Sequence, residues 1–409
     1  MQRVVITGAG VISPLSSQKE EFWAKLAAGE SGIGELTAFD TDQYEVKIAG
    51  EVRDFDPTLY MARKDSKRMD RFAQFAVAAA KKAVADAKIS LNGDETAVYI
   101  GAGIGGLQTI EEQHSCLLAK GPRRVSPFFI PMLIGNMAAG QVALQLGLKG
   151  PNFSIVSACS TGTHAIGEAM RLLQRKEVNV VLAGGAEATI LPMAVAGFSA
   201  MGALATGYND RPQEASRPFE KNRSGFVMSE GAGVLVLERL EHALARGAHI
   251  MAELAGYGAS CDAYHLTAPD KDGTGAVRSM SLAIKDAGLQ PADVDYINAH
   301  GTATKYNDAL ETLAIKKLFK DHAYKLAINS IKSMLGHLLG ASGAVEAIST
   351  ALTLERGLIP PTINYQEQDP ECDLNYTPNV AKKSEVKVAI SNSFGFGGHN
   401  ATVLLRKFN

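Results

Sequence analysis

Strand-like and helical segments alternate along almost the whole chain, and this alternation limits the fold more than any other feature. In the first half, continuously apolar strand-like runs occupy residues 96–101, 153–157, 178–184 and 233–237. Helical patterns precede and separate these runs, at about 66–87, at 133–146 and from 160 onward. The second half repeats the order, with helices at about 274–287, 308–319 and 340–354 and strands at 294–298, 326–329, 386–391 and 401–405. Continuously apolar strands are typical of sheets buried on both faces, so we predict an α/β chain of two similar units with active residues on loops at strand ends.

The composition excludes several classes of function. The 409 residues are 46% hydrophobic and 21% charged, which suits a globular enzyme with a large core. A net charge of −2 gives no reason to expect nucleic acid or a membrane surface as a partner. No apolar run approaches the ~20 residues that span a bilayer, and the first residues lack a signal-peptide pattern, so we expect no membrane insertion. The four cysteines fit neither zinc nor disulfide spacing, which favours a cytoplasmic location.

Cys159 is the strongest chemical signal in the chain. It lies where the apolar run at 153–157 ends and a helical pattern begins, next to the good N-cap residues Ser160 and Thr161. A thiol at a helix N-terminus faces unpaired N–H groups and the positive end of the helix dipole, and both favour the thiolate. This segment alone leaves two interpretations open, a nucleophile and a buried, inert cysteine.

The second half places further reactive groups near strand ends. His300 follows the strand at 294–298, and Lys332 and His337 lie in a loop of small residues after the strand at 326–329. Glu346 lies on the next helix, and a glycine-rich run surrounds Phe394. Taken singly, each of these residues is usually structural or solvent-exposed. Because they recur at equivalent places in two similar units, they indicate covalent catalysis with polarising groups.

Nucleotide and hydrolase motifs are absent from the sequence. The run at 101–106 follows a strand but lacks the full dinucleotide fingerprint with its acidic residue. The chain has no phosphate-binding G-x-x-x-x-G-K-[ST], no G-x-S-x-G and no H-E-x-x-H. We therefore expect no nucleotide cofactor and no catalytic metal.

Four ordered segments, at 158–162, 298–304, 332–337 and 392–398, resemble the motifs of the β-ketoacyl-[acyl-carrier-protein] synthases, and the elongating type II in particular. The resemblance covers essentially the whole chain. It implies the thiolase fold, a duplicated five-layered αβαβα architecture, and normally a homodimer. It assigns the nucleophile to an N-terminal half, residues 1–250, and the two histidines to a C-terminal half, residues 251–409.

The resemblance also implies a reaction, the decarboxylative Claisen condensation of fatty acid elongation. Cys159 would take an acyl chain from acyl carrier protein, and malonyl carrier protein would then lose carbon dioxide to form the attacking enolate. His300 and His337 would donate to the malonyl thioester oxygen, and the N–H groups of Cys159 and Phe394 would form an oxyanion hole. Lys332 would tune the field near His337.

Further residues take binding roles by the same resemblance. Glu346 would anchor its loop, with a structural monovalent cation near Asn298, Ser391 and Asn392. Thr302 and Thr304 would hydrogen-bond the phosphopantetheine arm that carries the substrates. An apolar acyl tunnel would be gated by Phe394 and lined by Ile104, Phe198 and Phe129. The acidic carrier protein would dock on one of two basic clusters, which contain Lys64, Lys67, Arg68, Arg123 and Arg124.

Single residues distinguish this chain from other enzymes of the same fold. Thiolases carry a second catalytic cysteine in a C-terminal glycine-rich loop, and the corresponding run at 394–399 has none. Initiating synthases and chalcone-type enzymes have a Cys-His-Asn set, whereas this chain has His337. A ketosynthase subunit or non-catalytic chain-length partner of a polyketide or aryl-polyene complex stays open as the alternative, although such partners lack the nucleophile.

Overall fold

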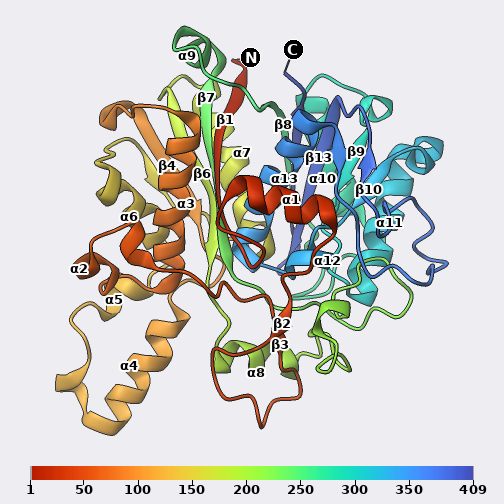
Figure 1. The fold of residues 1–409 in the computed structure, drawn as a ribbon. Helices are drawn as coiled ribbons and strands as arrows, with labels where there is room; N and C mark the ends of the chain where they lie inside the picture. Colours follow the sequence, from red (N-terminus) through yellow and green to blue (C-terminus); the bar gives the residue numbers. More distant parts are fainter. Residues whose placement is uncertain (1, 409) are drawn as a thin grey trace.

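The chain forms one ten-stranded sheet made of two equivalent halves, as the computed structural model, which describes residues 2–408, shows (Figure 1). The first half has the strand order β5 (Asn152–Phe153), β4 (Thr96–Gly101), β6 (Val180–Glu187), β7 (Gly231–Arg239) and β1 (Val4–Ile12). The second half has the order β10 (Ala327–Asn329), β9 (Tyr296–Asn298), β13 (Val388–Gly395), β14 (His399–Arg406) and β8 (Ala252–Cys261). The halves meet where β1 pairs with β8 over Val4–Ile6 alone.

The two halves also share their pattern of strand directions. In the first half, β5, β4 and β6 pair in parallel, and β6, β7 and β1 pair antiparallel. In the second half, β10, β9 and β13 pair in parallel, and β13, β14 and β8 pair antiparallel. The predicted duplication of an α/β unit is therefore confirmed, because strand order and strand direction both repeat.

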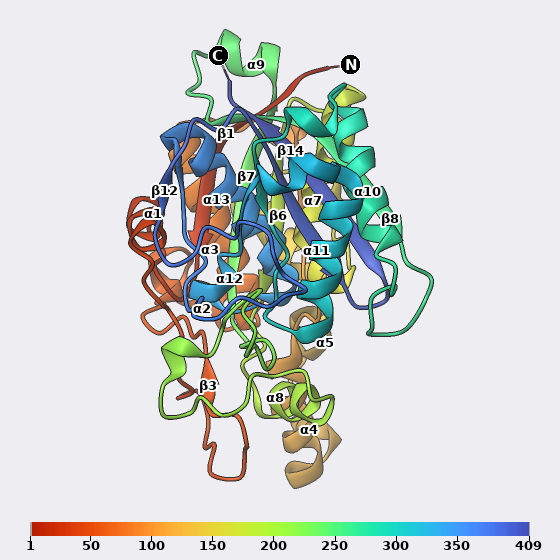
Figure 2. The same cartoon turned by 90° about the vertical axis from the view of Figure 1, so that its right-hand side faces the viewer.

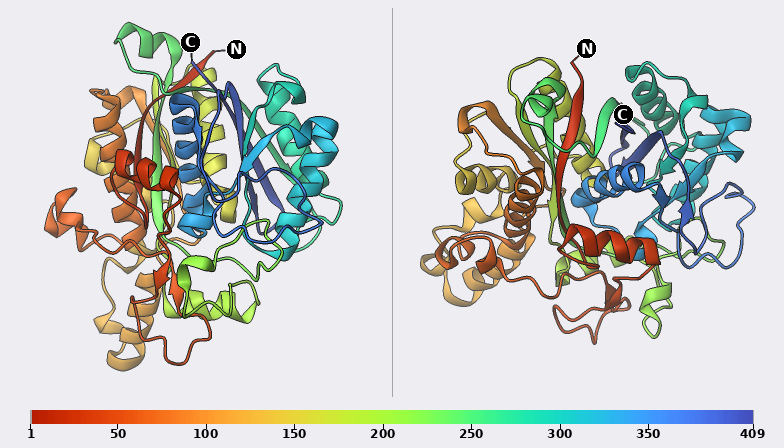
Figure 3. Two further views of the ribbon diagram at one scale, coloured as in Figure 1. Left: turned by 45° about the vertical axis from the view of Figure 1, so that its right-hand side comes forward. Right: turned by 45° about the horizontal axis from the view of Figure 1, so that its top comes forward.

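Helices complete five layers. Helices α7 (Thr161–Gln174) and α13 (Ser342–Arg356) lie between the two halves of the sheet, and the first thirteen residues of α13 are all buried (Figure 3). Helices α3 (Arg71–Ala87) and α6 (Met137–Leu146) cover the outer face of the first half. Helices α10 (Thr274–Asp286) and α11 (Lys305–Phe319) cover the outer face of the second half (Figure 2). The layers follow the order αβαβα predicted for this fold.

Close packing between layers depends on small residues. The face of α3 toward β1 is built almost entirely of alanine, and β1 presents Gly8 and Gly10 to it. A side chain on Gly8 would lie 2.6 Å from the backbone nitrogen of Ala87. The helix backbone therefore approaches the sheet more closely than larger residues would allow, and both faces of the sheet stay buried.

Some boundaries differ from the sequence-based predictions. The strand predicted at 153–157 is wrong beyond Phe153, because residues 154–157 leave the sheet and lead into a turn at Ala158, whose φ is +51°. The helices predicted at about 66–87 and 133–146 begin later, as α3 at Arg71 and α6 at Met137, and end at the predicted residues. The remaining helices are α1 (Lys19–Ala28), α2 (Arg63–Ser66), α4 (Leu107–Lys120), α5 (Phe129–Leu133), α8 (Pro192–Ala200), α9 (Leu240–Ala245) and α12 (Lys332–Leu335). The remaining strands, all of two residues, are β2 (Gly34–Glu35), β3 (Ile48–Ala49), β11 (Leu358–Ile359) and β12 (Lys382–Lys383).

Helices α4 and α5 form an arm that projects from the body beside α2 (Figure 1). Only Thr109 of α4 is buried, so this helix packs little of its surface against the body. Over residues 2–408, no helix combines the length and apolar character needed to cross a membrane.

Candidate active site

Cys159 lies at the N-terminus of α7, in the central helical layer. The strained turn at Ala158 directs the chain into α7, and the Cys159 side chain is buried. The next residue ties this turn to the second half, since the Ser160 hydroxyl lies 2.9 Å from the carbonyl oxygen of Ser393 and 2.7 Å from that of His399. Cys159, in the first half, is thus held against β13 and β14 of the second.

Burial controls the protonation of the thiol. It raises the pKa of Cys159 to about 11, although the positive charge of Lys332 and a backbone N–H bond lower it. Backbone N–H groups near the sulfur lower the pKa of Cys159, in the direction expected at a helix N-terminus, but loss of hydration outweighs them in the unliganded site. With a pKa of about 11, the Cys159 side chain favours the protonated thiol at neutral pH.

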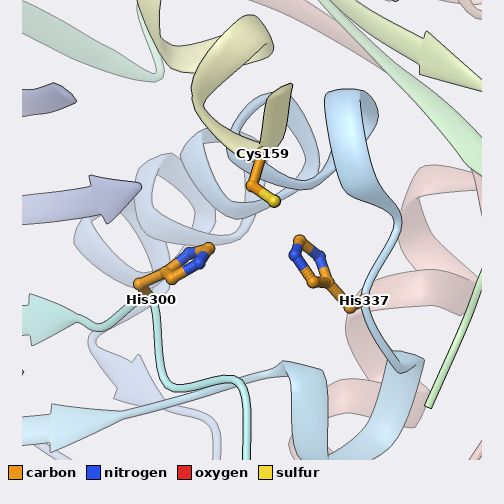
Figure 4. A group of neighbouring side chains, drawn as sticks. All are labelled: Cys159, His300 and His337. Carbon is orange, nitrogen blue, oxygen red and sulfur yellow. The ribbon is translucent and has the colours of Figure 1, made fainter. Parts of the chain in front are cut away.

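Two histidines from the second half face Cys159, and the three residues form what we call the Cys-His-His set (Figure 4). His300 follows β9, and His337 follows α12. One side-chain nitrogen of each histidine and the Cys159 sulfur all lie within 4.8 Å of one another. The two rings are edge to face, with centroids 5.4 Å apart. The structure thus brings together one residue from the first half and two from the second.

The hydrogen bonds of the two rings determine their tautomers. The Leu339 N–H donates to His337 Nδ1 at 3.2 Å, so the ring proton of His337 lies on Nε2. The Lys332 ammonium, which can only donate, lies 3.4 Å from His300 Nδ1 and places the His300 proton on Nε2 as well. Burial, and then the charge of Lys332, hold the pKa of each histidine well below its usual range. Both rings are therefore neutral Nε2–H donors.

Lys332 and Glu346 form a buried ion pair behind His300. Both side chains are about 2% exposed, and Lys332 Nζ donates to the carbonyl oxygen of His300 at 2.7 Å and to a Glu346 carboxylate oxygen. The structure contradicts the interpretation of Lys332 as a surface lysine and of Glu346 as a solvated helix residue. The pair holds the His300 backbone and keeps a positive charge near the Cys-His-His set.

The glycine-rich loop turns a different backbone N–H group toward Cys159 than that of the predicted Phe394. The N–H group that reaches the Cys159 sulfur from the glycine-rich loop belongs to Phe396, two residues beyond Phe394. Phe394 lines the cavity instead, with its ring 5.9 Å from the His300 ring. The motif contains two phenylalanines separated by one glycine, and the sequence alone does not tell which N–H turns toward the sulfur.

A cavity of about 570 Å³ opens from the Cys-His-His set. Its lining is mainly apolar and includes Ile104 and Phe198, as predicted, together with Thr302 and Thr304. The two threonine hydroxyls lie 2.9 Å apart. The prediction that Phe129 lines the cavity is wrong, because Phe129 lies half-buried on α5 and does not contribute to the cavity lining of this chain. The segment 262–269 also contributes lining residues that no sequence signal indicated.

Three buried oxygens at the predicted cation site have no hydrogen-bond partner among residues 2–408. They are Asn298 Oδ1, Ser391 Oγ and Glu346 Oε2. Asn298 and Ser391 are directly paired across β9 and β13. Asn392 differs, since its Oδ1 accepts a hydrogen bond from the Thr402 hydroxyl at 2.9 Å. Buried polar groups without partners are rare, and three oxygens suit a hard monovalent cation.

The Cys-His-His set also has the donor atoms of a zinc site, but its chemistry fits a proton-donating role better. A zinc ligand must offer a free nitrogen, and both Nε2 atoms carry protons. The ammonium of Lys332 faces the same set and opposes a second positive charge.

The two predicted basic clusters lie on one side of the molecule, around α2 and the α4–α5 arm (Figure 1). Their side chains are exposed, and the guanidinium of Arg68 lies 4.5 Å from the centre of the Phe128 ring, between the clusters. The exposed basic residues are Lys64, Lys67, Arg68, Arg123 and Arg124.

Comparisons with known proteins cover the chain almost completely. Residues 1–243 match the model of the beta-ketoacyl synthase N-terminal domain, and residues 251–366 match that of the C-terminal domain. The chain is 52% identical over 410 residues to a 3-oxoacyl-[acyl-carrier-protein] synthase 2 of Synechocystis sp., covering 100% of this chain and 98% of that protein. It is 50% identical to the Staphylococcus aureus protein of the same name, covering 100% of this chain and 99% of the relative.

Solved structures agree with the fold. The ishigamide ketosynthase/chain length factor superposes with a TM-score of 0.94 at 39% identity, with 100% of both chains covered. A beta-ketoacyl synthase from Burkholderia phymatum superposes with a TM-score of 0.92 at 35% identity, again with both chains covered completely. A type II polyketide ketosynthase solved with its acyl-carrier protein has the same score and identity.

Proposed function

The chain belongs to the β-ketoacyl synthase family, and we propose that it catalyses the elongating condensation of fatty acid synthesis. Malonyl-[acyl-carrier protein] condenses with a Cys159-bound acyl chain, giving 3-oxoacyl-[acyl-carrier protein] and carbon dioxide. The observation that carries this proposal is the convergence of a buried thiol and two neutral Nε2–H imidazoles at the end of an apolar cavity. The curated relatives at 50–52% identity, named 3-oxoacyl-[acyl-carrier-protein] synthase 2, support it.

Acyl transfer comes first. The Cys159 sulfur attacks the thioester carbonyl, and the N–H groups of Cys159 and Phe396 stabilise the oxyanion that forms. Collapse of this intermediate breaks the bond to the pantetheine sulfur, and the proton lost by Cys159 leaves with that thiol. Because the cavity is mainly apolar, an alkyl chain gains hydrophobic stabilisation by entering it.

Decarboxylation follows in the same site. As the malonyl carboxylate leaves as carbon dioxide, negative charge develops on the thioester oxygen, and the two Nε2–H groups of His300 and His337 hold it. The enolate carbon attacks the Cys159 thioester carbonyl, the carbon–sulfur bond breaks, and the released Cys159 thiolate takes up a proton from solvent. Neutral imidazoles suit this step because they donate without carrying a full charge in the ground state.

Acyl carrier protein delivers both substrates. Thr302 and Thr304 line the cavity and offer hydroxyl groups to the phosphopantetheine arm. The exposed basic clusters at Arg68 and Arg123 provide a surface for an acidic carrier protein. A structural monovalent cation at Asn298, Ser391 and Glu346 would satisfy their unpaired oxygens, and its removal by dialysis against a large organic cation should lower stability before it lowers activity.

The protein is proposed to act as a cytoplasmic homodimer. Strand β5 is a free edge of the ten-stranded sheet, and Phe153 on it is 59% exposed. Val156 and Leu144 nearby are 61% and 71% exposed, which is typical of a surface covered by a partner. Sedimentation of the intact chain and of a Phe153→Asp variant tests this, because only the variant should run as a monomer. The four cysteines are all unpaired, in keeping with a reducing compartment.

The test of function separates the two half-reactions. Cys159→Ala should form no acyl-enzyme by mass spectrometry, whereas Cys159→Gln should still release carbon dioxide from malonyl carrier protein because both histidines remain. An acyl-enzyme band in Cys159→Ala would remove Cys159 as the nucleophile. The intact Cys-His-His set favours this function over a non-catalytic chain-length partner.

A further inference from the structure

Glu187 is a buried carboxylate at the end of β6, and neither acyl transfer nor decarboxylation as described above uses it. Its side chain is fully buried, and none of the described residues pairs with it as a cation. Its partners are four backbone N–H groups. Oε2 accepts from Gly103 at 2.7 Å and Gly340 at 3.1 Å, and Oε1 accepts from Ile104 and Gly105 at 3.2 Å each.

These donors belong to two different walls of the active site. Gly103, Ile104 and Gly105 form the loop after β4, and the Ile104 side chain lines the acyl cavity. Gly340 belongs to the turn after His337, next to Leu339, whose N–H sets the His337 tautomer. One carboxylate therefore joins the wall of the acyl cavity to the loop that orients a decarboxylation donor.

The packing around Glu187 leaves little freedom. A side chain on Gly103 would lie 2.7 Å from Glu187 Oε2, and one on Gly340 would lie 2.8 Å from it. The backbones of these two glycines also touch each other, since a Cβ on Gly340 would collide with the Gly103 nitrogen. Burial raises the pKa of Glu187 to about 7 despite its four N–H bonds, so the chain keeps a carboxylate here at a cost.

We propose that Glu187 is a positioning residue that couples the Ile104 loop to the His337 turn, so that acyl-chain binding and malonyl decarboxylation depend on one carboxylate. This inference rests on the proposed function. It assigns to Glu187 no contact with substrate: the carboxylate acts through the backbone of two loops.

Glu187→Gln is the sharpest variant because of the hydrogen-bond pattern. Each carboxylate oxygen accepts from two N–H groups, so the amide NH₂ of glutamine opposes two donors in either orientation. Glu187→Asp keeps the charge but is one methylene too short to hold both loops. Glu238→Gln is the matched control, since Glu238 is equally buried but bonds to Thr7, His242 and Arg246, away from the Cys-His-His set.

Each variant is measured in two assays, acylation of Cys159 by a long-chain acyl carrier protein and carbon dioxide release in a Cys159→Gln background. We expect Glu187→Gln to lower both rates about 10- to 100-fold, the cost of moving a reacting group by about 1 Å, with the Glu238→Gln rates unchanged. Hydrogen exchange should rise together at amides 103–105 and 340.

Alternative roles give different results. A purely electrostatic role predicts faster acylation in Glu187→Gln, because the Glu187 charge raises the pKa of Cys159 and its removal would favour the thiolate. Faster acylation would overturn the coupling. So would a folded Glu187→Gln variant in which only one of the two rates falls, or in which neither rate falls. If Glu187→Gln does not fold, Glu187→Asp replaces it: both rates should fall, and a fall in one rate alone, or in neither, overturns the coupling. A wild-type protein without condensing activity would instead refute the proposed function.

Discussion

Replacing Lys332 by methionine separates the stability of the buried ion pair from its catalytic effect. Methionine fills a similar volume but leaves Glu346 as an unpaired carboxylate in a site about 2% exposed. Removing one partner of a buried pair typically costs about 3–5 kcal/mol in free energy of unfolding, a large part of the ~5–15 kcal/mol of a typical protein. The double variant Lys332→Met with Glu346→Gln removes both charges and should recover most of that loss.

Activity should not recover with stability. Both variants lack the donor at His300 Nδ1 and the donor to its carbonyl oxygen, 3.4 and 2.7 Å away in the native protein. The His300 ring can then carry its proton on either nitrogen, and we expect carbon dioxide release to fall about 10²–10³-fold, as when one oxyanion donor is lost. Without the Lys332 charge, the pKa of both histidines should rise, moving the acid limb of the rate to higher pH.

The assays are denaturant unfolding and carbon dioxide release from malonyl carrier protein in a Cys159→Gln background. Arg246→Met is the matched control, since it breaks the ion pair with buried Glu238, near α9. It should lower stability and leave carbon dioxide release unchanged. If the double variant recovered both stability and decarboxylation, Lys332 would act only by neutralising Glu346, and its assigned effect on His300 would be wrong.

Three further predictions follow from the same geometry. Ile104→Phe should weaken the binding of long acyl chains about 5- to 150-fold while short acyl chains react normally, because overpacking the cavity wall costs ~1–3 kcal/mol. A uniform loss of rate for acyl chains of six to sixteen carbons would show that the acyl chain does not pass Ile104. Charge reversal at Arg123 and Arg124 should raise the KM for carrier-protein substrates but not for a small pantetheine thioester, since both side chains are exposed; equal losses would indicate misfolding. The two histidines of the Cys-His-His set should stay neutral, with the proton on Nε2, from pH 8 to about 6.5, because burial and Lys332 penalise the protonated rings. Below about pH 6.5 the unfolded chain binds protons first, so the free energy of unfolding should fall. ¹⁵N NMR measures the protonation of each ring, and titration of either ring near pH 7 would contradict the assignment.

The regular elements that the sequence predicts best are those with long apolar runs. Strand β4 matches its predicted bounds, and α10 differs by one residue, because each buries a continuous apolar face. Strand β8 and helix α4 were missed. Strand β8 is rich in glycine and alanine and has no strong pattern, and α4 buries almost nothing. The periodicity of apolar residues indicates which side chains are buried. Elements with few apolar side chains, or with exposed ones, are therefore hard to predict from the sequence.

The reactive residues were predicted because each lies in a loop or turn of small residues and carries an uncommon chemical group. Cys159, His300 and His337 belong to segments whose small neighbours and glycines are visible in the sequence. Glu187 was missed because its only partners are backbone N–H groups from loops more than 80 residues away along the chain. A carboxylate at the end of a strand gives no sign that four donors will converge on it.

The sequence by itself determined the duplicated α/β plan, because periodicity encodes which residues are buried and where strands end. Its motifs predicted Cys159, His300 and His337 as the reactive set through their resemblance to a known family. The tertiary structure alone decided their chemical state. Cys159 is a thiol rather than a thiolate because both halves of the molecule together remove its hydration. The histidines are Nε2–H donors because Lys332 and the Leu339 N–H occupy the other nitrogen. Phe396 rather than Phe394 offers its N–H to the sulfur, since protonation and donor direction depend on three-dimensional neighbours that no local pattern records.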